Sequence, residues 1–385
     1  MTYRHDRKLK LLVIEPDPSF GGGSEAVMLS LAGGLAERGH EITLLHERDG
    51  SMLEDYLALS TRVVRAPLPG FSFRAPLRTL ACVLRIGRLA RQLGSDVIVS
   101  SHLGFLRHAA LIRLASGVPS CFHLGLSLDH GPTSLRLALP RIGAGVAPSA
   151  HTLQTWRAGG WYPATLHQVD NWVDGSRFKP AADLQRLREE TGMPGDGAHI
   201  VYVGRVCRQK GVDVLIGAFP RVLQRCPDAT LHIIGPVPAD FEARLAQLLE
   251  QLGRPARDRV ILRPATATPE KFYAAADVVC APSTGDEAFG LAVLEAMSCG
   301  VPVVATDIGV IAAILGSGQA DLLVAPGDSS ALAERLSTWI ERPADRRRVG
   351  AILRQRAMRE FGIERGVDRY ESILQSLVAA RTAGG

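Results

Sequence analysis

Two glutamates late in the chain, Glu287 and Glu295, are the side chains best placed to do chemistry, and seven residues separate them. Glu287 precedes a predicted helix, and Glu295 lies within it among apolar side chains. A carboxylate in such surroundings is costly to bury without a partner, and vicinal hydroxyl groups are good partners for it. The turn Phe289-Gly290-Leu291 offers unpaired N–H groups at the helix start, which suit a phosphate. The cluster predicts a ligand with phosphate and hydroxyl groups, and an exposed helix position is the alternative for Glu295.

A second predicted loop, Gly204 to Gly211, carries Arg205 and Lys210 between an apolar run and a predicted helix. Cations beside a helix N-terminus form a clamp for a diphosphate. The loop is not a P-loop, because no Gly-Lys-Ser/Thr sequence closes it. Solvent-facing cations are the alternative interpretation, since charged side chains usually lie on the surface.

A third loop contains the consecutive glycines Gly21, Gly22 and Gly23, which follow an apolar run and open an amphipathic segment. Glycine lets backbone N–H groups approach an oxyanion, and a helix N-terminus adds partial positive charge. The spacing is not the G-x-G-x-x-G of dinucleotide-binding proteins. The glycines predict a phosphate contact, and a simple tight turn is the alternative.

Strand-like apolar runs alternate with helical patterns along the chain, which predicts parallel sheets with crossover helices. The runs are 9–14, 41–46, 96–100, 118–122 and 145–148, then 200–203, 230–234, 260–262, 277–281, 301–304 and 322–324. In such sheets ligands bind beyond the carboxyl ends of the strands. The expected fold is therefore α/β, with two Rossmann-like doubly wound domains facing a central cleft. All three loops follow strands.

The length of 385 residues suits two domains of ordinary size. A polar stretch with Pro and Gly, residues 176–197, is the predicted linker. It separates a first domain, residues 1–175, from a second domain, residues 198–358.

The composition excludes several classes of protein. An apolar content of 46% and a charged content of 22% are those of an ordinary globular protein, and no apolar stretch is long enough to span a membrane. The six cysteines include no close pair, so neither a zinc site nor a disulfide framework is indicated. We expect a cytoplasmic protein without a metal site.

Residues 56–95 contain seven arginines and no acidic residue. Phe71, Phe73 and Leu77 lie among these arginines, and such a basic, partly apolar surface suits anionic lipid or a phosphorylated partner. We expect a peripheral position at the inner face of the cell membrane through residues 62–91, with a solvated helix face as the alternative. Nucleic acid is not an expected partner, because no recognised binding motif accompanies the arginines.

Taken together, these motifs resemble those of the retaining glycosyltransferases of family 4, which have the GT-B fold. The resemblance covers most of the chain and rests on many segments in the same order. The matching segments are Gly22-Gly23 with Glu25, Arg38-Gly39-His40, Asn171 with Val173-Asp174, Gly204-Arg205, Lys210-Gly211, Ile233-Ile234-Gly235, Glu287 to Met297, Gly300 to Thr306 and Val324 to Asp328.

The resemblance implies transfer of a hexose from a nucleotide diphosphate sugar to a glycan, lipid-linked or other hydroxyl acceptor. Retention at the anomeric carbon and the absence of a cofactor or required metal are implied as well. UDP is the first donor nucleotide expected and GDP the second. The first domain, with a C-terminal helix at about 360–380 packed back on it, would bind the acceptor, and the second domain would bind the nucleotide sugar.

The family's donor-site residues carry over onto this chain. Arg205 and Lys210 would hold the diphosphate, Glu295 would bind the ribose, and Glu287 would contact the donor sugar. Backbone groups of Gly22, Gly23, Gly235, Phe289, Gly290 and Leu291 would complete the substrate contacts. The segments 235–237 and 262–264 are expected beside the base. Since no carboxylate is placed as a nucleophile, we expect front-face attack, in which the phosphate held by the two cations takes the acceptor proton.

His123 follows an apolar strand and matches a functional histidine of the family, which would lie near the sugar. With Glu287, Arg205 and Lys210 it completes the predicted catalytic residues. A structural histidine is the alternative, and His102 and His151 are weaker candidates of the same kind.

Val310 and Ala313 stand where the family usually has a glycine and a glutamate. This departure leaves room for an unusual acceptor or for weakened activity. Two alternatives therefore stay open: a sugar-nucleotide-binding partner subunit without turnover, and a nucleotide-sugar epimerase on the same scaffold.

Overall fold

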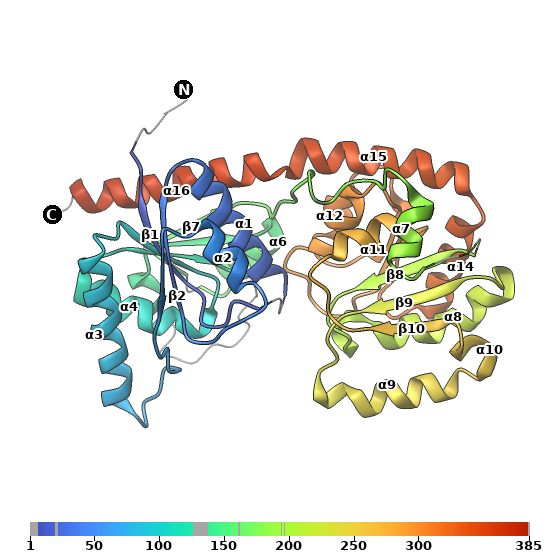
Figure 1. Cartoon of the computed structure of the whole chain (residues 1–385), viewed down its shortest axis with the longest axis horizontal. Coiled ribbons are helices and arrows are strands. Elements are labelled where there is room, and N and C mark those ends of the chain that lie inside the picture. The colour runs from blue at the N-terminus through green and yellow to red at the C-terminus, as the bar shows by residue number, and fades with distance from the viewer. Residues whose placement is uncertain are drawn as a thin grey trace. The chain divides into compact units, whose positions relative to one another are not determined.

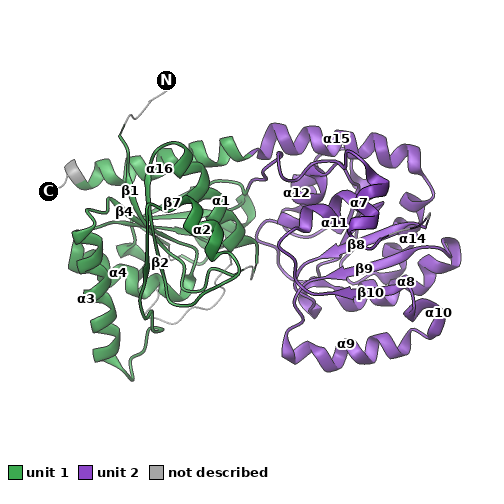
Figure 2. Cartoon of the chain, in the orientation of Figure 1, with its two compact units in different colours: residues 1–171, 363–385 green, residues 172–362 purple. Residues whose placement is uncertain are grey.

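The computed structural model describes residues 7–19, 22–125, 138–160, 162–193, 195 and 197–383. The chain forms two compact units, one of residues 1–171 and 363–385 and the other of residues 172–362 (Figure 2). Each unit is built around one parallel sheet with helices on both faces (Figure 1). Among the described residues, no helix has the length and apolar character needed to cross a bilayer.

The sheet of the first unit has the strand order β3-β2-β1-β4-β5-β6-β7, and every pair is parallel. Its strands are β1 (Lys10–Ile14), β2 (Glu41–His46), β3 (Arg62–Arg65), β4 (Val97–Ser100), β5 (Ser120–His123), β6 (Ala144–Ala147) and β7 (Thr165–Gln168). Its described helices are α1 (Gly23–Glu37), α2 (Leu53–Leu59), α3 (Pro76–Gln92), η1 (Leu103–Phe105), α4 (Leu106–Ser116), η2 (Leu139–Arg141), α6 (Ala150–Ala158) and α16 (Ile363–Ala383). Helices α3 and α4 cover the sheet face that carries Leu12 and Ile14. Helices α1 and α16 pack together on the other face (Figure 1).

The sheet of the second unit has the order β10-β9-β8-β11-β12-β13, again all parallel. Its strands are β8 (His199–Val203), β9 (Thr230–Ile234), β10 (Val260–Arg263), β11 (Val278–Ala281), β12 (Val303–Thr306) and β13 (Leu323–Val324). Its helices are α7 (Leu184–Glu190), η3 (Arg208–Lys210), α8 (Val212–Arg225), α9 (Ala239–Gln251), α10 (Arg254–Arg257), α11 (Pro269–Ala275), α12 (Leu291–Ser298), α13 (Ile311–Leu315), η4 (Ala320–Leu322), α14 (Ser329–Ile340) and α15 (Pro343–Phe361). The central strands are buried on both faces, which explains their continuous apolar runs.

In both sheets the strand order reverses near the centre. The order reverses between β1 and β4 in the first unit and between β8 and β11 in the second. Ligands of doubly wound sheets bind at such switch points, outside the carboxyl ends of the strands. The loops that follow β1, β4, β8 and β11 are therefore the places where function is expected.

The segment predicted as a linker, residues 176–197, is part of the second unit, which begins at Trp172. It contains α7, which Asp183 caps by accepting a hydrogen bond from the Arg186 N–H at 3.0 Å. Arg188 of α7 donates to Asp277 at 2.6 Å, and Met193 is fully buried. Residues 176–197 therefore include a short polar helix, and its composition resembles that of a linker because none of its side chains is fully buried.

Helix α16 belongs to the first unit and is held to α1 by charge and close packing. Arg38 forms ion pairs with Glu364, Asp368 and Glu371 at 2.7 to 2.9 Å. A Cβ atom added to Gly34 would lie 2.7 Å from Val367, so only glycine allows the two helices to approach this closely.

Candidate functional site

Two loops meet at the switch point of the second sheet, one after β8 and one after β11. The N–H groups of Thr284 and Gly285 donate to the carbonyl of Gln209 at 2.9 and 3.0 Å. Gly211 has a φ of +69°, and an added Cβ atom would lie 1.8 Å from the Pro282 carbonyl oxygen. Glycine at 211 is therefore a requirement of the contact between the loops.

Lys210 and Glu287 form an ion pair across these loops. The Nζ atom of Lys210 donates to Oε1 of Glu287 at 2.5 Å, and the Ser283 hydroxyl donates to the same oxygen at 2.6 Å. Thr306, at the end of β12, donates to the Ser283 carbonyl at 2.6 Å and so fixes that residue. Both bonds to Glu287 reach Oε1, so Oε2 remains open to a further donor within the described part of the chain.

Arg205 lies at the start of the same loop and is exposed. Its backbone carbonyl accepts a hydrogen bond from the Tyr202 hydroxyl at 2.6 Å, while its guanidinium has no ion pair among the described residues. Gly235 follows β9, and a Cβ atom there would lie 1.9 Å from the Gly204 carbonyl oxygen. The two strand ends can lie this close only because Gly235 has no side chain.

The turn Phe289-Gly290-Leu291 leads into α12. Gly290 has a φ of +88° and is the N-cap of the helix. Phe289 is buried with its ring centroid 5.9 Å from that of Phe361. The side chain of Phe289 thus belongs to the core, and this residue can offer only its backbone to a ligand.

Glu295 is half-buried on α12, as the sequence predicts, while Glu287 lies on the preceding loop. Burial raises the pKa of Glu295 to about 7, although the neighbouring Tyr273 hydroxyl and Arg177 act in the opposite direction. Glu295 is therefore partly protonated near neutral pH, because it has too few hydrogen-bond donors around it to stabilise its negative charge.

The glycine loop of the first unit precedes α1. Gly21 lies outside the described residues, Gly22 is the N-cap and Gly23 is the first residue of the helix. A Cβ atom on Gly22 would lie 3.2 Å from Oε2 of Glu25, which is in the first turn. A carboxylate therefore already lies beside this helix N-terminus, where an anion is favoured.

His123 is the last residue of β5 and has no exposed surface. Its Nδ1 lies 2.7 Å from the hydroxyl of Tyr370 on α16, and its Nε2 has no hydrogen bond within the described residues. Burial lowers the pKa of His123 to about 4, so the ring is neutral at physiological pH. Ser24 and Gly125 lie near the edge of the His123 ring. A Cβ atom added to Gly125 would be 2.1 Å from Ser24 Oγ and 3.8 Å from His123 Cδ2.

Both halves of the chain match a glycosyltransferase family. Residues 21–177 match the family described as Glycosyltransferase Family 4, and residues 197–342 match Glycosyl transferases group 1. The phosphatidyl-myo-inositol mannosyltransferase of Mycobacterium tuberculosis is 30% identical over 352 residues, which are 85% of this chain and 86% of that protein. The chain belongs to the family 4 glycosyltransferases.

Other relatives agree with this assignment. The D-inositol 3-phosphate glycosyltransferase 1 of Catenulispora acidiphila is 30% identical over 306 residues, covering 76% of this glycosyltransferase and 70% of its relative. The crystal structure of Anabaena HepE in complex with UDP and glucose superposes with a TM-score of 0.82 at 23% identity, over 96% of this chain and 100% of that one. Sucrose-phosphate synthase from Thermosynechococcus elongatus gives 0.79 at 20% identity, over 97% and 100%. These structures establish the fold of the glycosyltransferase as GT-B, with two Rossmann-like domains.

The departure at Val310 and Ala313 is located at α13 of the glycosyltransferase. Val310 is the N-cap of α13, and Ala313 is exposed. Arg356 of α15 donates to the carbonyl groups of Ala313 and Ile314, both at 2.8 Å. These carbonyl groups at the end of the short helix therefore already have a cationic hydrogen-bond donor. Within the described residues, no group of three or more His, Cys, Asp or Glu side chains is arranged to hold a metal ion.

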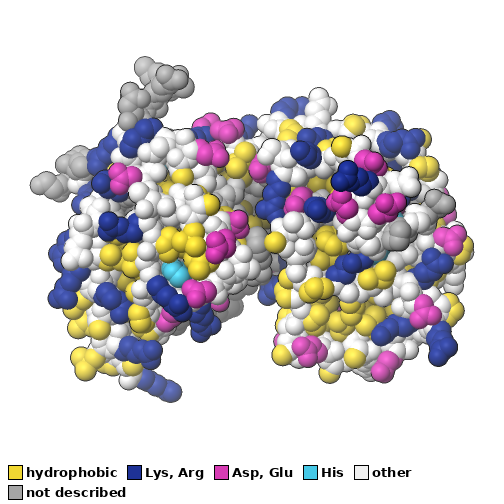
Figure 3. Space-filling view, in the orientation of Figure 1, with side chains coloured by type: hydrophobic (Ala, Val, Ile, Leu, Met, Phe, Trp, Pro, Cys, Tyr) yellow, Lys and Arg dark blue, Asp and Glu magenta, His cyan; other side chains and the backbone are white. Residues whose placement is uncertain are grey.

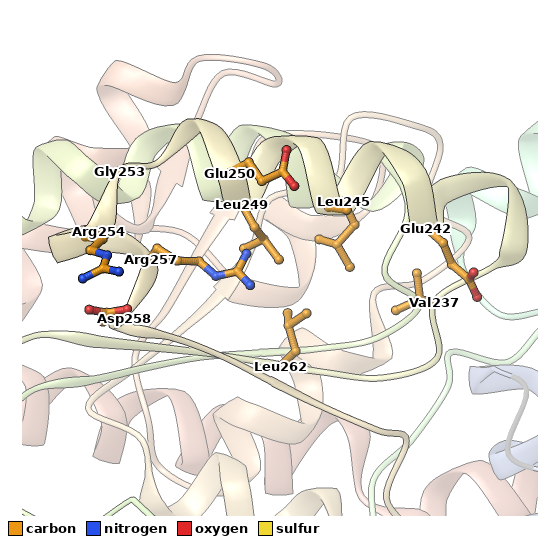
Figure 4. Close-up of a pocket in the computed structure, with 11 residues that line it drawn as sticks. Val237, Glu242, Leu245, Leu249, Glu250, Gly253, Arg254, Arg257, Asp258 and Leu262 are labelled. Carbon is orange, nitrogen blue, oxygen red and sulfur yellow. The ribbon is translucent and has the colours of Figure 1, made fainter.

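A hollow of about 600 Å³ lies between α9, α10 and the edge strand β10 of the glycosyltransferase (Figure 4). Leu245 and Leu249 point from α9 toward Leu262 of β10, and Arg257 reaches beneath them. Of the positions expected beside the donor base, Val237 and Leu262 line this hollow. Arg205, Lys210, Glu287 and Glu295 do not line it.

Sequence reasoning did not find Ser283, Tyr273 or Tyr370 as neighbours of the candidate residues. Ser283 lies inside the motif that carries Glu287, and a hydroxyl four residues before a loop carboxylate could have signalled it. Tyr273 and Tyr370 come from other helices, and no local pattern marks them.

Proposed function

We propose that this glycosyltransferase transfers a hexose from UDP-sugar to a hydroxyl group of an inositol-phosphate acceptor, with retention and without a metal ion. The observation that carries the donor part is the joined pair of loops at the second switch point. There Lys210 and Ser283 both donate hydrogen bonds to Glu287, and Glu295 follows on α12. HepE, which shares the fold, is described in complex with UDP and glucose. GDP is the second donor nucleotide to be tested.

The chemistry follows from these side chains. Lys210 and Arg205 bind the diphosphate, and the N–H groups that begin α12 add partial positive charge. The bond between the anomeric carbon and the phosphate oxygen breaks while the acceptor oxygen bonds to the same face of that carbon. The acceptor proton passes to the departing phosphate oxygen, whose charge the two cations stabilise in the transition state. Glu287 accepts hydrogen bonds from the sugar through its open oxygen, and Glu295 accepts them from the ribose.

The donor part is tested by calorimetry and thermal shift with UDP, GDP, ADP and their sugars in EDTA. A ligand of the native state raises Tm in proportion to its affinity. We expect one nucleotide to bind the wild type, with affinity reduced about ten- to hundredfold in Lys210→Ala, because a charged hydrogen bond is worth about 1.5–3 kcal/mol. Lys271→Ala, which removes a half-exposed lysine of the same unit, is the matched control. Absence of nucleotide binding would refute the proposal, and binding without transfer would favour the partner-subunit alternative.

The acceptor part rests on what the two relatives share. Their descriptions name D-inositol 3-phosphate and phosphatidyl-myo-inositol, and both compounds carry an inositol ring with a phosphate. Transfer to D-inositol 3-phosphate and to phosphatidylinositol in mixed vesicles is measured with the nucleotide sugar found above, and proton NMR of the product gives the anomeric configuration. An inverted product would disprove retention. If no product forms with either of the two acceptors, the acceptor class is disproved.

We further propose that α3 binds an anionic membrane surface. Its inner face buries residues such as Val83 and Ile86, while Leu77 and Leu80 are 81% and 50% exposed on the other face. Arg78 flanks these leucines, and the edge of the unit where α3 lies shows both basic and apolar side chains (Figure 3). Apolar insertion plus attraction to anionic lipid is how such a helix face binds a bilayer surface.

Flotation with phosphatidylglycerol and with phosphatidylcholine vesicles tests this surface. We expect binding to the anionic vesicles only, and its loss in Leu77→Gln/Leu80→Gln and at high salt. Ile352→Gln, an exposed apolar residue of α15, is the control and should float like the wild type. Equal binding to both kinds of vesicle, or none, would contradict the proposal.

A further inference from the structure

Two hydroxyl groups in a row link the second sheet to the carboxylate of Glu287. Thr306 is the last residue of β12, and its hydroxyl donates to the carbonyl of Ser283 at 2.6 Å. The Ser283 hydroxyl in turn donates to Oε1 of Glu287 at 2.6 Å. Ser283 follows β11 by two residues, and β11 and β12 are paired neighbours. The orientation of the carboxylate is therefore tied to the sheet through these two hydroxyl groups.

The two donors to Glu287 differ in charge and in their freedom to move. Lys210 carries its cation on a long side chain that is 27% exposed, whereas Ser283 is neutral, short and buried. A nucleoside diphosphate attracts the ammonium through its negative charges, but it has no comparable attraction for a neutral hydroxyl group. A bound diphosphate therefore competes with Glu287 for Lys210 and leaves the bond from Ser283 in place.

The hydroxyl of Ser283 is not needed to join the two loops of the site. The backbone N–H groups of Thr284 and Gly285 donate to the carbonyl of Gln209, and neither bond involves the Ser283 side chain. Removal of the hydroxyl would leave these bonds intact. The hydrogen bond from Ser283 therefore acts on the Glu287 carboxylate itself.

The Glu287 carboxylate is also accessible to a ligand. Its side chain is 13% exposed, and both described donors bond to Oε1 rather than to Oε2. A carboxylate with one fixed oxygen presents the other in a defined direction, and a directed acceptor suits a sugar hydroxyl group. How firmly Oε1 is held therefore controls how well Oε2 can bind the donor sugar.

We propose that Ser283 is the positioning residue that keeps Glu287 oriented toward the donor sugar while Lys210 binds the diphosphate. Thr306 supports this role by fixing Ser283 through its carbonyl group. The inference rests on the proposed donor site and deepens it, because it divides the site into two tasks. Lys210 binds the phosphate groups that free nucleotide and nucleotide sugar share, whereas Ser283 and Glu287 together distinguish the nucleotide sugar from the free nucleotide.

Calorimetric titrations test this division by comparing UDP with UDP-glucose and GDP with GDP-mannose. We expect Ser283→Ala to weaken binding of the nucleotide sugar about five- to tenfold and binding of the free nucleotide less than about twofold. Lys210→Ala should weaken both by a similar factor, since both ligands contain the diphosphate. Ser337→Ala is the control, because it removes another buried hydroxyl of the same unit, which donates to the Ala333 carbonyl at 2.8 Å, and it should change neither Kd.

Two further comparisons separate positioning from a structural role. Thr306→Val removes the hydroxyl that fixes Ser283 and should weaken nucleotide-sugar binding, whereas Thr306→Ser keeps this hydroxyl and should restore the wild-type Kd. Glu287→Ala has no carboxylate to position, so adding Ser283→Ala to it should change the nucleotide-sugar Kd by less than about twofold. The Tm of each variant is measured alongside, so that a loss of folded protein is not mistaken for a loss of affinity.

The outcomes also show which proposal fails. If Ser283→Ala weakens free nucleotide and nucleotide sugar equally, the hydroxyl serves the structure of the site, and the inference is wrong while the donor proposal stands. The same conclusion follows if Ser283→Ala has its full effect in the Glu287→Ala background. If the wild type binds neither nucleotide, the donor proposal fails and the inference fails with it.

Discussion

The hydroxyl of Tyr370 lies 2.7 Å from Nδ1 of His123, and both side chains are fully buried. The histidine ends a strand of the first sheet, whereas the tyrosine comes from the last helix of the chain. Because His123 is neutral, a phenol O–H that donates to Nδ1 places the ring proton on Nε2, on the edge that Ser24 and Gly125 adjoin. The last helix thus contacts the ring nitrogen whose protonation distinguishes the two tautomers of the candidate catalytic histidine.

We predict that Tyr370→Phe lowers kcat about tenfold and leaves the nucleotide Kd unchanged. The change removes one oxygen atom and creates no cavity, so the free energy of unfolding should fall by only about 1 kcal/mol. Nitrogen NMR of the His123 ring should show the Nε2–H tautomer in the wild type and a mixture in the variant. Tyr162→Phe, a half-exposed tyrosine of the same unit, is the control. An unchanged kcat together with a tautomer mixture would exclude a catalytic role for the ring proton.

Nucleotide binding is predicted to strengthen between pH 6 and pH 8 through Glu295. Because the pKa of Glu295 is raised to about 7, the folded protein keeps a proton on this carboxyl group at pH values where the unfolded chain has already lost it. This group therefore contributes less to stability as pH rises from about 4.5 to about 7. Ribose hydroxyl groups favour the carboxylate, so binding should weaken by up to about tenfold per pH unit below pH 7. Calorimetry on Glu295→Gln separates this from phosphate titration, because that variant should lose the part of the pH dependence that Glu295 causes.

Glu287→Gln should distinguish the sugar from the nucleotide. The amide removes a charge that pairs with Lys210, which leaves the ammonium free for phosphate, so the Kd of UDP should be equal or lower than in the wild type. The Kd of the UDP-sugar should rise about fivefold or more, because an amide accepts sugar hydroxyl groups less well than a carboxylate. Parallel titrations with UDP and UDP-glucose measure the ratio. Equal effects on both ligands would mean that Glu287 does not contact the sugar.

Arg38→Ala should loosen α16 from α1. Arg38 is 22% exposed and pairs with three carboxylates, of which Glu364 and Asp368 are largely exposed, so we expect a loss of only about 1 kcal/mol, smaller at high salt. Arg38 and His40 hold the pKa of Glu371 below its usual value despite burial, so this contribution is present above about pH 4.5 and is lost as pH falls through the folded pKa. Hydrogen exchange across 363–383 should report both effects. Arg48→Ala is the control, and equal exchange in the two variants would contradict the prediction.

Two glycines of the second unit should respond in opposite directions to alanine. Gly211→Ala forces a side chain into a left-handed conformation and against Pro282, so it should cost at least about 2 kcal/mol and abolish nucleotide binding. Gly217→Ala lies in the interior of α8 with open space around it and should stabilise the protein by about 0.5–1 kcal/mol. Urea denaturation measures both. Similar free energies for the two variants would show that the loop contact is not a constraint.

The central strands could be predicted to within one or two residues because both of their faces are buried, as β2 and β9 illustrate. The strands β3 and β7 were missed because they form the two edges of the first sheet, where their side chains are only partly buried. Helix α7 was missed for a related reason, since none of its residues is fully buried.

The loops of the donor site could be predicted together because each follows a strand, and parallel strands bring their carboxyl ends to one edge. Which side chains complete the site could not be predicted. The contact between His123 and Tyr370 spans 247 positions. The contact of His102 Nε2 with Glu15 Oε1, at 3.1 Å, depends on β1 and β4 becoming neighbours. Such contacts are set by topology, while sequence patterns report local periodicity.

The position of α16 has a consequence for biosynthesis. Val367, which packs against Gly34 of α1, the acidic partners of Arg38 and the phenol that contacts His123 all lie on α16, which is synthesised after the whole second unit. The second unit can therefore fold before the first is complete, and the nascent first unit exposes an uncovered helix until α16 has been synthesised. Termination between the second unit and α16 would thus damage the unit that is synthesised first.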